Sequence, residues 1–88
     1  MPLLSKFLGI LITMYAEAGG KHSKPHFHAK YAEFDAVYDF EGNLLQGGLP
    51  KKQAKMVEVW LELRVDDLKT NWSLIQEGKA HYKIDPLQ

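Results

Sequence analysis

The sequence predicts an α+β fold, in which a small antiparallel sheet of three to four strands packs against two C-terminal helices. Three observations lead to this prediction. Apolar and polar side chains alternate over residues 26–31 and 34–40, which is the period of a half-buried strand. From Lys51 onward the apolar residues follow the spacing of a helix. The chain has 88 residues, which predicts a single domain spanning residues 1–88.

The first expected strand is the apolar, partly β-branched segment at residues 10–15. Gly19 and Gly20 follow it in a polar loop that should end the strand. Pro25 then stands at the entry to the next strand, where a missing backbone N–H is tolerated. The apolar run at residues 7–15 is too short for a bilayer, which takes about 20 residues. We therefore expect a cytoplasmic protein with no membrane partner.

The second and third strands are expected to form a hairpin around a short turn at residues 32–33. In this register the opposite face is polar, and one face carries Phe27, Ala29, Tyr31, Phe34, Ala36 and Tyr38. A slip of one residue would mix the two faces, so the alternation itself favours the register, although Ala-Glu is a poor hairpin turn. The expected cross-strand pairs are Tyr31–Phe34, Lys30–Asp35, His28–Val37 and His26–Asp39.

The remaining chain should give a turn at residues 41–43, a short edge strand at 44–46 and then the helices. Pro50 suits a first helical position. A second helix should begin near Asp66 and Asp67, whose charges suit a helix N-terminus, with Trp72 on its inner face. Gly78 suits the residue after its end. Residues 80–84 then form a last strand or an extended tail.

Composition limits the classes of function. There are 11 Lys and Arg residues and 11 Asp and Glu residues, so the formal net charge is zero. Strong binding to nucleic acid regardless of its sequence usually needs a clear basic excess. The chain has no cysteine, which excludes disulfides and thiolate metal ligands. The glycine pairs lack the pattern of a phosphate-binding loop, and no cofactor can be named from the residues.

The most unusual feature is the pair of histidines in the segment at residues 22–28. On a strand, His26 and His28 point to the same face, with their bases about 7 Å apart. Imidazoles at this spacing could act as a general acid–base pair or share a metal ion with His22. Asp39, opposite His26, could orient its ring or add a ligand. The structural alternative is that His26 and Asp39 form a simple cross-strand pair on a partly solvent-exposed face.

Basic residues flank the histidines and suggest a different ligand. Lys24 and Lys30 could steady a phosphate near the two imidazoles. Lys24 and Lys21 would also disfavour a bound cation and favour an anion. The pattern thus leaves three readings of this face: a structural pair, a surface for a partner, and a metal or catalytic site.

Motifs along nearly the whole chain resemble the bacterial family known as domain of unknown function 4160. The segments that carry the resemblance are Phe7-Leu8-Gly9-Ile10, Met14-Tyr15, Pro25-His26-Phe27-His28-Ala29-Lys30-Tyr31, Leu49-Pro50, Trp60-Leu61-Glu62-Leu63, Asn71-Trp72 and Ile84-Asp85-Pro86-Leu87. The resemblance implies a small cytoplasmic protein, often encoded beside a second small protein of the domain of unknown function 2442 type. It also implies His22, His26 and His28 as functional positions.

This chain departs from the family pattern just before those histidines. The family commonly has an acidic residue and a second proline where this sequence has Lys21 and Lys24. Three functions follow as hypotheses. The first is a protein-interaction component of a toxin–antitoxin-like or regulatory pair, which uses the His-bearing sheet face. The second is a His-dependent toxin or nuclease directed at RNA, and the third is metal binding through the histidines.

Overall fold

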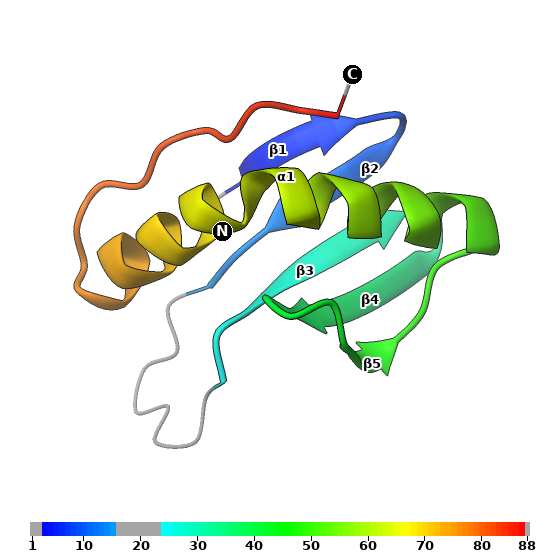
Figure 1. Cartoon of the computed structure of the whole chain (residues 1–88), viewed down its shortest axis with the longest axis horizontal. Coiled ribbons are helices and arrows are strands. Elements are labelled where there is room, and N and C mark those ends of the chain that lie inside the picture. Colours follow the sequence, from blue (N-terminus) through cyan, green and yellow to red (C-terminus); the bar gives the residue numbers. More distant parts are fainter. Residues whose placement is uncertain (1–2, 16–23, 88) are drawn as a thin grey trace.

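Five antiparallel strands and one helix make up the part of the chain that the computed structural model describes, residues 3–15 and 24–87. The strands lie in the sheet in the same order as in the sequence, and the helix crosses one face of the sheet (Figure 1). The elements are β1 (Leu3–Phe7), β2 (Ile10–Thr13), β3 (His26–Tyr31), β4 (Phe34–Asp39), β5 (Leu44–Gly47) and α1 (Lys51–Gln76). The predicted α+β class is confirmed, but the numbers of strands and helices differ from the prediction.

The sheet has five strands rather than the predicted three or four. The prediction missed β1 because this strand is not evident from the sequence. β1 and β2 both lie within or beside one continuous apolar run, and the chain reverses between them at Leu8 and Gly9. Both turn residues have positive φ, 50° for Leu8 and 81° for Gly9. Leucine rarely adopts this conformation, so the turn leaves little trace in the sequence.

The described residues contain one helix, α1, rather than the predicted two, but a kink lies two positions before the predicted start of the second helix near Asp66. The helix bends at Arg64, whose φ of −121° and ψ of 15° are not helical, and then continues to Gln76. No glycine or proline lies between Lys51 and Gln76 to end it. The helix therefore continues beyond the kink at Arg64.

The predicted register of the central hairpin is confirmed. Tyr31 pairs with Phe34, and His26 pairs with Asp39 at the other end. Ala32 in the turn has a φ of 52°, which lets this Ala-Glu turn reverse the chain. Phe34 is 39% exposed although the pattern placed it on the core face. It lies directly beside the turn, at the end of the sheet.

The core fills the space between the helix and one face of the sheet. Trp60 of α1 is fully buried. Its ring packs against Phe7, with centroids 5.4 Å apart, and edge-on against Phe27 at 5.8 Å. These contacts tie β1 and β3 to the same point on α1. Val59 and Leu63 belong to the opposite side of the helix and are 49% and 61% exposed.

The two edges of the sheet differ. Residues 79–87 form an extended tail that returns along β1 (Figure 1), and the Ile84 N–H donates to the Leu4 carbonyl at 2.8 Å. Ile84 itself is only 3% exposed, and the Trp60 indole N–H donates to the Asp85 carbonyl at 2.9 Å. At the other edge, all four residues of β5 are exposed. The chain therefore covers one edge of its own sheet and leaves β5 uncovered by any described segment.

The buried position of Ile84 predicts that the tail contributes to stability. We expect Ile84→Ala to lower the free energy of unfolding by about 2–4 kcal/mol, because it leaves a cavity beside the core. Urea denaturation followed by tryptophan fluorescence measures this change. Leu63→Ala is the matched control and should change stability by less than about 1 kcal/mol, because Leu63 is on the exposed side of α1. Equal effects of the two substitutions would contradict the packing of the tail.

Candidate functional site

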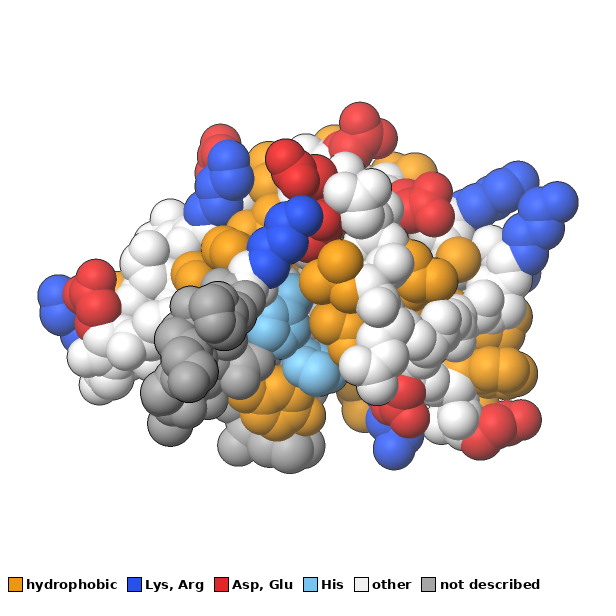
Figure 2. Space-filling view, turned by 90° about the horizontal axis from the view of Figure 1, so that it is seen from below, with side chains coloured by type: hydrophobic (Ala, Val, Ile, Leu, Met, Phe, Trp, Pro, Cys, Tyr) orange, Lys and Arg blue, Asp and Glu red, His pale blue; other side chains and the backbone are white. Residues whose placement is uncertain are grey.

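Strand β3 presents His26 and His28 on one side, as the sequence predicted. Their ring centroids are 5.4 Å apart, with the ring planes inclined at 64°. Both side chains are half-buried. Figure 2 shows histidine atoms reaching the surface between hydrophobic side chains. The two imidazoles are therefore close neighbours, and each is surrounded by other rings.

Aromatic contacts and one short hydrogen bond orient the two histidines. The His28 ring meets Tyr15 edge-to-face at 4.6 Å, and the His26 ring lies 5.3 Å from Trp72 of α1. Nδ1 of His26 lies 2.6 Å from the Lys24 carbonyl oxygen. Since a carbonyl oxygen only accepts, Nδ1 carries the proton. In neutral His26 the lone pair is then on Nε2, the atom that would act as base or ligand.

Asp39 lies opposite His26 as predicted, but its carboxylate serves the turn between β4 and β5. The side chain is completely buried. Oδ1 accepts the backbone N–H groups of Glu41 at 2.9 Å and Asn43 at 2.8 Å. Oδ2 accepts the side-chain amide of Asn43 at 3.0 Å and pairs with Lys24 Nζ at 2.9 Å. A buried carboxylate with four such donors is a structural anchor.

This arrangement keeps the carboxylate ionised. Burial by itself would raise the pKa of Asp39, but the hydrogen bonds from Lys24, Asn43 and the Glu41 backbone outweigh it and hold this pKa far below its usual range. The hydrogen bond and the charge of Asp39 in turn raise the pKa of Lys24. Lys24 also lies 3.5 Å from Glu41, in an exposed ion pair. The predicted binding residues Lys24 and Asp39 are therefore partners of each other.

The other predicted site residues are less constrained by the structure. Lys30 is exposed on β3, opposite Asp35. His22 lies outside the described residues, so the three-histidine metal site stays a prediction. Among residues 3–15 and 24–87, no three His, Asp or Glu side chains are placed to hold a metal ion.

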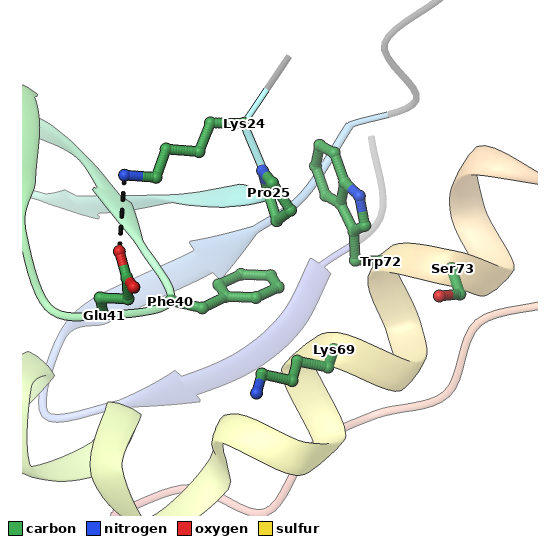
Figure 3. Close-up of a pocket in the computed structure, with 7 residues that line it drawn as sticks. All are labelled: Lys24, Pro25, Phe40, Glu41, Lys69, Trp72 and Ser73. Carbon is green, nitrogen blue, oxygen red and sulfur yellow. Dashed lines mark ion pairs between the residues drawn. The ribbon is translucent and has the colours of Figure 1, made fainter. Parts of the chain in front are cut away.

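A groove beside the histidines was missed by the sequence analysis. A cavity of about 420 Å³ lies between the start of β3, the β4–β5 turn and the second half of α1 (Figure 3). Trp72, predicted as core, is only half-buried and lines this cavity with Phe40, at a centroid distance of 6.2 Å. No local pattern could have predicted the groove, because its walls come from residues about 30 positions apart. The lining residues are Lys24, Pro25, Phe40, Glu41, Lys69, Trp72 and Ser73.

Comparison with protein families gives one match. The family model described as Domain of unknown function (DUF4160) matches residues 9–73. The chain belongs to this family. The DUF4160 match extends from the β1–β2 turn into the second half of α1, so it includes both histidines of β3 and the lining of the groove. β1 and the C-terminal tail lie outside it.

Two further comparisons find nothing: no curated protein and no solved structure matches this DUF4160 chain significantly. Within the described residues, no helix combines the length and hydropathy needed to cross a membrane. The family assignment therefore supports the resemblance that the motifs suggested.

The anchoring role of Asp39 predicts a pH-dependent contribution to stability. At pH 7 we expect Asp39→Asn to lower the free energy of unfolding by about 2–3 kcal/mol, because charge-assisted hydrogen bonds are lost. The folded-state pKa is below the unfolded value of about 3.9, so the contribution is complete above that value and shrinks as the pH falls below it. In urea denaturation, the difference in the free energy of unfolding between wild type and Asp39→Asn should be smaller at pH 3 than at pH 7.

The exposed residue Asp35 on the same strand provides the control for this measurement. Asp35→Asn should change stability by less than about 0.5 kcal/mol at pH 7. If Asp39→Asn and Asp35→Asn had the same effect at both pH values, the Asp39 carboxylate would not be the anchor described above.

Proposed function

We propose that this chain is the interaction component of a two-protein bacterial system, a toxin–antitoxin-like or regulatory pair. Its partner is a second small protein encoded nearby, which adds an extended segment to the open edge of the sheet at β5. The observation that carries the proposal is the contrast between this edge and the opposite edge, which the chain's own tail covers.

The composition of β5 supports this role. Natural proteins usually protect an open edge strand with charged side chains, proline or a covering segment. β5 has the sequence Leu-Leu-Gln-Gly, with no charge and no proline. Leu44 is 50% exposed and Leu45 is 46% exposed. An uncharged edge with two exposed leucines provides backbone hydrogen bonds and apolar contacts to a strand that pairs with it.

The edge is held in place before any partner binds. Gly47 has a φ of 71°, and a Cβ at this position would lie 2.1 Å from the Asp35 carbonyl oxygen. Only glycine therefore allows β5 to approach β4 so closely. The next residue, Gly48, donates its N–H to the same oxygen at 2.9 Å. A preformed edge lowers the conformational entropy that this chain loses when a partner binds.

The histidine face offers less surface to a partner than β5. His26 and His28 are half-buried, with Tyr15 and Trp72 packed against their rings. Cleavage of RNA by these histidines and metal binding stay hypotheses from the sequence. The zero net charge of the chain gives RNA little general attraction.

Co-expression with the product of the neighbouring gene tests the proposal. The two proteins should co-elute in size-exclusion chromatography, and backbone amides of β5 should exchange more slowly with deuterium in the complex. Leu45→Lys should weaken binding at least about tenfold, because a lysine at the edge opposes strand pairing.

Leu63→Lys is the matched control for this experiment. It places the same charge on a leucine that is more exposed, at 61%, but lies on α1 away from β5. It should leave the affinity unchanged. Separate elution of the two wild-type proteins at micromolar concentration would refute the pairing, and equal effects of the two lysine variants would refute the role of β5.

A further inference from the structure

The groove lined by Phe40 and Trp72 extends beyond the first cavity along α1. A second cavity of about 520 Å³ is lined by Phe40, Glu41, Gly42, Glu58, Leu61, Glu62 and Val65. Phe40 and Glu41 line both cavities, so the two adjoin at this point. Together they form one groove between the β4–β5 turn and α1, which we call the turn–helix groove.

The floor of the turn–helix groove is apolar. Phe40, Val65 and Trp72 are partly buried, and Leu61 is 3% exposed. The Phe40 ring also lies 6.4 Å from Phe27 of the core, so the floor continues into the packed interior. Such a floor accepts apolar side chains, and its rigidity comes from the core behind it.

One end of the groove is acidic. Glu58 and Glu62 are exposed on α1 one turn apart, and neither forms an ion pair with the described residues. Burial and the charge of Glu58 raise the pKa of Tyr38. Like charges at this helical spacing repel each other. A cation bound between Glu58 and Glu62 would relieve this repulsion.

The other end is basic. Figure 3 shows Lys69 on α1 and Lys24 at the start of β3 on different walls of the cavity. Lys24 is already paired with Asp39 and Glu41. Lys69 forms no ion pair in the part of the chain that the structure describes. Its ammonium group is therefore available to pair with an anionic group of a ligand.

We propose that the turn–helix groove binds an extended peptide segment that carries a basic side chain at Glu58 and Glu62 and an acidic side chain at Lys69. This inference rests on the proposed function, because it describes a second segment that the partner protein presents. The opposite charges at the two ends set the orientation of the peptide. Apolar side chains between them lie over Phe40 and Trp72.

The helix sets the spacing of the two charges in the peptide. Lys69 lies seven positions after Glu62 and eleven after Glu58, which corresponds to about 10 Å and about 16 Å along α1. An extended chain covers about 3.3 Å per residue, so the basic and acidic residues should be about three to five positions apart. A nucleic acid fits this groove poorly, because its phosphates would face Glu58 and Glu62.

Selection from a displayed library of random peptides, about eight residues long, tests this inference on the intact chain. Enriched peptides should contain a basic and an acidic residue at the expected spacing, with an apolar residue between them. Glu62→Lys and Lys69→Glu should each weaken a selected peptide at least about tenfold. The double variant should instead prefer the same peptide with its two charges exchanged.

Lys52→Glu is the matched control, because it makes the same charge change on an exposed part of α1 outside the groove. It should leave peptide affinity unchanged, and so should Leu45→Lys at β5. Enrichment without this charge pattern, no enrichment at all, or insensitivity to Lys69→Glu would overturn the inference. If the neighbouring gene product did not bind but the selected peptides did, the proposed function would fail while the groove assignment stood.

Discussion

The buried carboxylate of Asp39 connects the two surfaces on which the proposed function depends. It closes the turn that leads into β5 through Glu41 and Asn43, and it binds Lys24 at the entry to β3. A buried charge is tolerated here because four donors satisfy it. The open edge at β5 and one wall of the turn–helix groove are therefore held by the same side chain.

Packing continues from the core to the surface through a row of rings. Phe27 contacts Trp60 in the core and Phe40 at the groove, and Trp72 contacts both Phe40 and His26. His26 and His28 of β3 are thus at the end of this aromatic network. Their rings pack against Tyr15 and Trp72, and we propose that a partner binds at the open β5 edge and in the groove.

The segments of β2, β3, β4 and β5 could be predicted from the sequence, whereas β1 was missed. The register of β3 and β4 could be predicted because a one-residue slip would mix two distinct faces. β1 was missed because the turn before β2 uses Leu8, a residue type rarely found at positive φ. The same-side placement of His26 and His28 follows from strand geometry. The groove could not be predicted in this way, because Phe40 and Trp72 come together only through tertiary packing.

The most direct test of this account is an NMR titration of the aspartate carboxyl carbons. Asp39 should keep the chemical shift of an ionised carboxylate down to about pH 3, below the ordinary aspartate pKa of about 3.9. A midpoint for Asp39 at that ordinary value would contradict the anchor, and with it the common support for β5 and the groove.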